Sequence, residues 1–359
     1  MDKPARYDYL FVPDLKALRR KVRNASGALA HLVRATESHN AFRYLATGRE
    51  GYAEKALADI RRMLDHYLAG ELTYDVHFHT WCNAAPMARL AASLDWIADS
   101  PAVSKKEFAR IKEAILDYTL KHPFTRMKGR VASCDNQISA MAFCCALVGY
   151  LFGMKRGNDP RAQRLMSAGL MRYPDIFGLS EPGGYSYEGS TYFCQIVSPI
   201  TCWFTALAEE ITGEDCFTRR YPPNGVSPEE ILRMYQRIIG PSGLMPPWDN
   251  YGWMRCCSTM GLAYLAYKTG DPSPLAVMEA LNLGAEPVHV AWGTDDRIWT
   301  IIWWPEQLQQ DCTTPAFRDW AVANVAASLV SERKQWRLFQ CWDRCGAGVY
   351  CGRAQVNPN

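Results

Sequence analysis

Apolar positions recur with helical spacing through most of the first 285 residues of this chain. Between residues 14 and 35 they stand three or four positions apart, at Leu15, Leu18, Val22, Leu29, Leu32 and Val33. Similar patterns predict further helices at about 39–46, 51–68, 80–98, 104–121, 137–153, 160–172, 191–212, from 227, 254–268 and 274–282. Because no strand pattern interrupts these runs, the sequence predicts a mainly α fold.

Helix ends are marked by short polar phrases. Ser104-Lys-Lys-Glu107 predicts a capping box, and Ser227-Pro-Glu-Glu230 predicts another with proline at the first helical position. Thr-Gly followed by charged residues recurs at Thr47, Thr212 and Thr269, where the glycine can end one helix just before the next begins. Helices joined pairwise in this way predict stacked helical hairpins, as in an α/α toroid or solenoid.

The pattern changes after about residue 285. Residues 286–315 read as an aromatic-rich connector with Trp292, Trp299, Trp303 and Trp304. Strand-like runs begin at Trp320 and Trp336. A lone hairpin is not stable by itself, so we expect residues 316–359 to be a partial β domain, the truncated start of an antiparallel β-sandwich. Residues 1–285 are then an incomplete toroid domain.

Composition limits the class of protein. The chain has 359 residues, 48% of them hydrophobic, which is enough for a large core in one big domain or two. Its net charge of +3 makes no electrostatic case for nucleic acid, although a local patch can still serve an anionic substrate. No signal-peptide pattern follows Met1, so we expect a cytoplasmic protein, or a periplasmic or secreted one if the N-terminus is incomplete.

The cysteines and one long apolar run fit ordinary roles in a protein core. The chain has 13 cysteines, several within apolar helical runs, which predicts reduced, buried thiols rather than a disulfide framework. No pair of CxxC motifs indicates a structural zinc site. The run from Ile138 to Met154 falls short of the roughly 20 residues that a membrane span needs, so it predicts a buried core helix and no span.

The most informative stretch is Glu181-Pro-Gly-Gly-Tyr-Ser-Tyr-Glu-Gly-Ser-Thr-Tyr192. Its glycines end one helical segment and open the next, with Tyr192 in the first turn. Backbone N–H groups at a helix start favour negative charge, so a phenolate or an anionic substrate can be held there. The same pattern also fits a glycine-rich helix entry with packed aromatic side chains.

Several phrases together resemble the heparinase II/III-like polysaccharide lyases, which include oligo-alginate lyases. Gly184-Tyr-Ser-Tyr-Glu-Gly-Ser-Thr-Tyr192 is similar to that family's Gly-x-Tyr-x-Glu-Gly-x-x-Tyr, and Cys134-Asp-Asn-Gln137 precedes an apolar helix as it does there. Tyr9-Leu-Phe-Val-Pro-Asp-Leu-Lys and Ala91-Ala-Ser-Leu-Asp-Trp96 extend the likeness over about residues 8–285. Pro247-Trp-Asp249 stands where a Gly-Asp phrase is usual.

The resemblance implies an α/α toroid followed by a β-sandwich and β-elimination on uronic-acid polysaccharides. Asn136 matches the family's Asn that neutralises the uronate carboxylate, and Tyr192 matches its catalytic Tyr. Relatives often carry His where Gln137 stands here, and an amide is no base. This favours Tyr192 as both base and acid, helped by a cation such as Arg126 or Arg130. We expect Asn136 and Tyr192 to face one cleft.

Further residues are candidates for substrate contact. They are Gln137, Arg130, Tyr187, Glu188, His79, Trp248 and Asp249. Four of them have a plainer alternative: capping or packing for His79, loop ordering for Glu188, core packing for Trp248 and surface solvation for Arg130. Asp95 is expected to be structural. The resemblance implies no cofactor, although relatives sometimes carry a metal site in the β domain. The implied partner is an anionic polysaccharide or oligosaccharide, and the oligomeric state is not specified.

Three other functions stay open on the sequence. A uronate C5-epimerase shares the proton abstraction but does not expel O4. A toroidal glycoside hydrolase needs two carboxylates beside the scissile bond, for which Asp135, Glu188 and Asp249 are candidates. A non-catalytic glycan-binding toroid is the third alternative, favoured by the missing sheet.

Overall fold

A computed structural model describes residues 8–68, 84–128, 136–184, 196–239, 244–245, 254–255, 258–280 and 296–305. This part of the chain is mainly helical, which confirms the predicted class. The helices of the first half are α1 (Leu15–Arg23), α2 (Gly27–Ala35), α3 (Asn40–Thr47), α4 (Glu50–Leu68), α6 (Ala84–Ile97), α7 (Lys105–Thr119), η1 (Leu120–Phe124), α8 (Thr125–Lys128), α9 (Asn136–Tyr150) and η2 (Leu151–Lys155). Those that follow are α10 (Pro160–Leu170), α11 (Tyr173–Gly178), α13 (Ser198–Thr212), α14 (Pro228–Ile238), α15 (Met260–Thr269), α16 (Ser273–Ala280) and α17 (Asp296–Trp303).

The one β ladder in the described residues is very short. Strand β1 (Leu244–Met245) pairs antiparallel with β2 (Met254–Arg255), Leu244 opposite Arg255. The predicted helix at 254–268 was therefore wrong at its start, because α15 begins only at Met260. Residues 316–359, where a partial β domain is predicted, lie outside the described ranges.

The predicted helix ends are confirmed where they can be seen. Ser227 and Glu230 form a complete capping box. At the second predicted box only one half is present: the Ser104 hydroxyl accepts a hydrogen bond from the Glu107 amide, whereas the Glu107 carboxylate pairs with Arg61 and Arg110. The three Thr-Gly phrases each end a helix on a left-handed glycine, with φ of 69° at Gly48, 72° at Gly213 and 70° at Gly270. Only a residue without Cβ adopts this conformation freely, so each glycine stops its helix cleanly.

Two helices differ from the prediction. The run 14–35 is broken into α1 and α2 at residues 24–26, where Asn24 caps the first helix and Gly27 opens the second with φ of 54°. The predicted helix at 191–212 is confirmed from Ser198 onward as α13, and residues 191–195 lie outside the described part.

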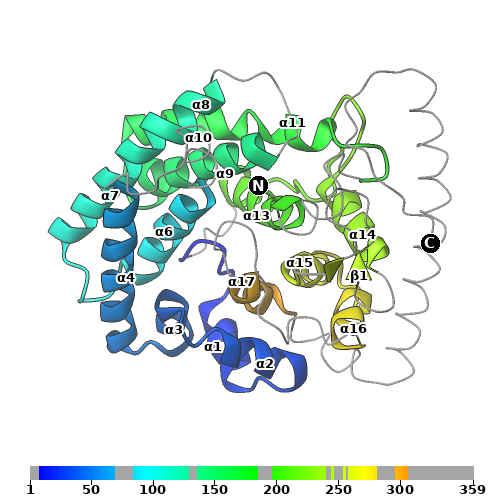
Figure 1. Cartoon of the computed structure of the whole chain (residues 1–359), viewed down its shortest axis with the longest axis horizontal. Coiled ribbons are helices and arrows are strands. Elements are labelled where there is room, and N and C mark those ends of the chain that lie inside the picture. The colour runs from blue at the N-terminus through cyan, green and yellow to red at the C-terminus, as the bar shows by residue number, and fades with distance from the viewer. Residues whose placement is uncertain are drawn as a thin grey trace.

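Helices adjacent in sequence pack as pairs: α3 with α4, α6 with α7, α9 with α10, α13 with α14, and α15 with α16. The first members of these pairs also pack beside one another in chain order, from α3 through α6, α9 and α13 to α15. In Figure 1 four of the second members, α4, α7, α14 and α16, lie toward the edges of the helical part, and α17 lies near the middle of the view. Helix α17 packs against α15, α2 and α1, and α1 packs against α3.

Helix α9 and its extension η2 are apolar and almost completely buried. Among the described helices only Asn136–Lys155 is long and apolar enough to cross a membrane, with a mean hydropathy of 1.6. Because 89% of that window is buried inside the protein, it packs as a core helix, as predicted. Cys144 and Cys145 on α9 are free and buried, and burial raises the pKa of the Cys144 thiol to about 12. The prediction of buried thiols is thus confirmed for this helix.

Helix α17 lies within the predicted connector, where no helix is predicted from the sequence. Its Trp299 packs against Phe11 and Trp96, with ring centroids 5.2 Å apart in each case, and against Trp203 at 5.5 Å. Lys21 donates hydrogen bonds to the carbonyls of Ile301 and Ile302, which lie near the end of α17. These contacts join α17 to the helical core.

Candidate functional site

Ion pairs join the C-terminal ends of helices α6, α9, α13 and α15. Since these helices also pack side by side, they run in the same direction. Each pair links one helix, or the η2 extension of α9, to the next helix along the chain. The pairs are Arg156 with Asp95 at 2.7 Å, Lys155 with Glu210 at 3.3 Å and Lys268 with Glu209 at 2.8 Å. The N-terminal ends of the same helices therefore gather at the opposite end of the assembly.

At that opposite end, α13 and α15 approach very closely. A Cβ on Gly261, the second residue of α15, would collide with the hydroxyl of Ser198, the first residue of α13. The same atom would come within 3.2 Å of the Tyr235 ring on α14. The close approach fixes the relative position of two helix starts.

Asn136, the predicted charge-neutralising residue, is the first residue of α9 and is buried, with 8% of its surface exposed. The first N–H groups of a helix have no partner inside the helix, and the helix dipole gives this end a partial positive charge. Asn136 therefore lies where an anionic group is favoured. Gln137 follows it and is partly exposed.

Arg126 is the predicted cation that the structure describes. It belongs to α8, which packs against α9. Its Nε is buried and has no hydrogen-bond partner within the described ranges. Such a guanidinium group can receive a carboxylate or lower the pKa of a neighbouring phenol.

The other predicted site residues lie outside the described part of the chain. They are Tyr192, Arg130, Tyr187, Glu188, His79, Trp248 and Asp249. The expected shared cleft of Asn136 and Tyr192 therefore stays a prediction. Along the chain, however, these residues all precede the starts of α6, α9, α13 or α15.

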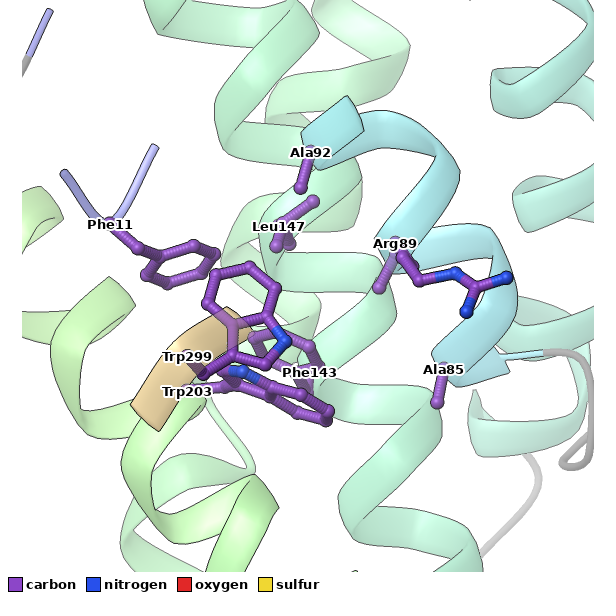
Figure 2. Close-up of a pocket in the computed structure, with 9 residues that line it drawn as sticks. Phe11, Ala85, Arg89, Ala92, Phe143, Leu147, Trp203 and Trp299 are labelled. Carbon is purple, nitrogen blue, oxygen red and sulfur yellow. The ribbon is translucent and has the colours of Figure 1, made fainter. Parts of the chain in front are cut away.

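The interior between the helices is closed by aromatic side chains. Phe143 of α9 stacks on Trp203 of α13 with ring centroids 5.7 Å apart. Figure 2 shows these rings with Trp299, and Arg89 on the other side of the small cavity that they line. That cavity of about 10 Å³ has room for roughly one water molecule. A saccharide cannot enter it.

A larger cavity of about 190 Å³ lies between α3, α4, α6 and α17. Sequence reasoning missed it, because its lining comes from four helices that are far apart in the chain. Its polar residues include Asn40, Asp59 and Arg89, and its apolar ones include Trp96 and Trp299. No local sequence signal marks such a site.

The buried acids at the C-terminal ends serve the fold. The Asp95 carboxylate accepts hydrogen bonds from the Leu10 amide and the Arg156 guanidinium, both at 2.7 Å, which confirms its structural role. Burial raises the pKa values of Asp95, Glu209 and Glu210, against the lowering effect of their cationic partners. Within the described ranges no group of three or more His, Cys, Asp or Glu residues could hold a metal ion.

Neither the protein-family models nor the curated protein sequences match this chain. Its functional interpretation therefore depends on its own residues and on the resemblance of its motifs.

Proposed function

We propose that this chain is the helical part of a polysaccharide lyase that cleaves a uronic-acid-containing glycan by β-elimination. Its helical hairpins would form an α/α toroid, with the reaction at the end where the paired helices α6, α9, α13 and α15 begin. The proposal is supported by two phrases, Cys134-Asp-Asn-Gln137 and Gly184–Tyr192, which resemble those of heparinase II/III-like lyases.

The packing order of the helices supports the toroid. A toroid requires hairpins that follow one another around a ring and a last element that returns to the first. The contacts run from α3 to α15 in order, and α17 then packs against both α15 and α1. Since α1 packs against α3, the series from α3 through α15, α17 and α1 can close into a ring.

The observation that carries the proposal is the place of Asn136 at the first residue of α9. The starts of the parallel helices α13 and α15 lie at the same end. Tyr192 precedes Ser198 by six residues, and six residues of chain reach at most about 20–22 Å. A chain of that length can bring Tyr192 to a substrate held by Asn136, as the proposal requires.

The proposed chemistry needs one proton acceptor and one charge stabiliser. The Tyr192 phenolate takes the C5 proton of the uronate while the Asn136 amide donates a hydrogen bond to the carboxylate. The C5–H electron pair becomes the C4–C5 double bond, and the C4–O4 bond breaks. Tyr192 then gives that proton to the departing O4 and returns to the phenolate form, ready for the next cycle. In net terms one proton moves from C5 to O4, and no water is consumed.

The experiment is product analysis with the chain extended through the predicted β domain. Alginate, heparan sulfate and glucuronan are each incubated with the protein, and the unsaturated uronate is followed by its ultraviolet absorbance. Formation of that product supports the lyase. New reducing ends without it indicate a hydrolase, and C5 inversion without cleavage indicates an epimerase. Binding without any of these changes indicates a glycan-binding toroid.

A further inference from the structure

The 190 Å³ cavity has a polar mouth and an apolar floor. Its mouth carries Asn40, Asp59, Arg62 and Ser93, all at least partly exposed. Its floor is made of buried side chains, among them Phe42, Ile60, Leu90, Trp96 and Trp299, each 4% exposed or less. A pocket with apolar walls and a few convergent polar groups is the usual form of a small-molecule site.

The polar groups at the mouth are held in place by one another. Asp59 accepts hydrogen bonds from Asn40 Nδ2 at 2.7 Å and from Arg62 at 2.8 Å, one on each carboxylate oxygen. A carboxylate oxygen has room for a second donor, and the Asp59 side chain is 34% exposed. It can therefore accept further hydrogen bonds from hydroxyl groups in the cavity.

The aromatic floor is rigid. Trp96 donates its indole N–H to the Leu10 carbonyl at 3.0 Å, which fixes the orientation of its ring. Trp299 lies against it with ring centroids 5.2 Å apart. Neither ring has to be ordered when a ligand binds, which reduces the entropy cost of binding.

The size of the cavity limits the ligand to one ring. An apolar cavity of about 150 Å³ is known to take up benzene, and drug-sized ligands need about 300–1,000 Å³. We propose that the cavity binds a single pyranose ring, with its C–H face on the tryptophans and its hydroxyl groups on Asp59 and Asn40. This site would be separate from the reaction site at Asn136, and the sugar unit that it holds would not react.

The ring that we expect is a hexuronate, and this choice rests on the proposed function. Arg89 also lines the cavity, from the second turn of α6. The lining contains two arginines, Arg62 and Arg89, and one acid, Asp59, so its formal charge is positive. A monoanionic sugar suits that charge better than a dianionic one.

The test is isothermal titration calorimetry of the full chain with sodium glucuronate. Benzoate serves as a second probe, since it has a six-membered ring and a carboxylate but no hydroxyl groups. Ser93→Phe places a ring inside the cavity, and Ser93→Ala is its control. Asp59→Ala removes the group that accepts hydrogen bonds from the sugar hydroxyls. Its control is Glu107→Ala. Glu107 lies on another helix and, like Asp59, pairs with an arginine three residues later, Arg110. Circular dichroism checks that each variant is folded.

We expect glucuronate to bind more tightly than benzoate, because benzoate has no hydroxyl groups for Asp59 and Asn40. Ser93→Phe should abolish the binding, and Asp59→Ala should weaken it by roughly 10-fold or more, as for a lost hydrogen bond to a charged group. The two controls should bind as the unchanged protein does. Absence of glucuronate binding, equal binding of benzoate, or unchanged binding by folded Asp59→Ala would each overturn the proposal.

The glucuronate titration tests the sugar site separately from the product analysis that tests the lyase. Glucuronate binding that depends on Ser93 and Asp59, together with no unsaturated product from any glycan, would support the sugar site and reject the lyase. Unsaturated product together with no effect of the cavity variants on glucuronate binding would support the lyase and reject the sugar site.

Discussion

Lys155 Nζ lies 3.3 Å from Glu210 Oε1, and the two side chains are only 7% and 1% exposed. The Tyr150 hydroxyl donates to the same oxygen at 3.1 Å. Because Lys155 ends η2 and Glu210 lies near the end of α13, the contact joins two neighbouring hairpins. Burial raises the pKa of Glu210, and Lys155 opposes this by favouring the carboxylate.

Replacing Lys155 with Met should destabilise the protein strongly. The change would leave the Glu210 carboxylate buried without its ammonium partner, which typically costs about 3–5 kcal/mol. Urea unfolding measures this free energy. The control is Arg110→Met, whose exposed pair with Glu107 should contribute about 1 kcal/mol or less. Equal losses in the two variants would contradict the buried pair.

Replacing two glycines with alanine should change the free energy of unfolding in opposite directions. Gly261→Ala should destabilise by about 1–3 kcal/mol, since its Cβ would collide with Ser198 and crowd Tyr235. Gly51, in the first turn of α4, has nothing within 4 Å of the added Cβ, so Gly51→Ala should gain up to about 1 kcal/mol from helix propensity. Thermal and urea unfolding compare them. Stabilisation by Gly261→Ala would mean that α13 and α15 are farther apart.

Glu107 should make folding stability depend on acid pH. Hydrogen bonds from Arg110 and Arg61 lower the pKa of this carboxyl from 4.5 to about 2. Since the folded value is below the unfolded one, the stabilisation is present above about pH 4.5 and is lost as the pH falls toward 2. The unfolding free energies of the unchanged protein and Glu107→Gln should therefore converge on acidification. A constant difference from pH 7 to 3 would contradict this assignment.

What the sequence predicts well here is local. The glycines Gly48, Gly213 and Gly270 end their helices as expected, and Ser227 forms its capping box, because each effect needs only a few neighbouring residues. Helix α17 was not predicted, since burial of Trp299 depends on Phe11 and other rings far away in the chain.

The candidate functional residues likewise include some that could be predicted from the sequence and some that could not. The position of Asn136 at a helix start follows from the polar phrase before an apolar run, so it could be predicted. The cavity beside Asp59 and Trp96 could not, because its walls exist only once α3, α4, α6 and α17 have packed. Local patterns place single residues, whereas cavities depend on tertiary contacts.

Asn136→Ala should reduce the cleavage rate while the helices stay folded. Loss of the amide that stabilises the developing negative charge typically costs about 10²–10³-fold in kcat. The measurement is the initial rate of unsaturated uronate formation by the chain extended through the predicted β domain. Gln137→Ala is the control, for which we expect a higher KM and a smaller change in kcat. A larger effect at Gln137 than at Asn136 would show that the charge-stabilising residue is misassigned.

Tyr192→Phe should be the most damaging single change to activity. It keeps the aromatic ring but removes the hydroxyl, so proton transfer is lost; general acid–base groups typically contribute about 10²–10⁴-fold. One group that serves both steps should cost at least that much. The pH profile separates a catalytic role from a structural one: the rate of the unchanged enzyme should rise with pH as the phenol ionises, and the residual rate of Tyr192→Phe should lack that step. A folded Tyr192→Phe variant with near-full activity and the same pH profile would exclude Tyr192 as the base, and the proposed elimination would then need a different proton acceptor.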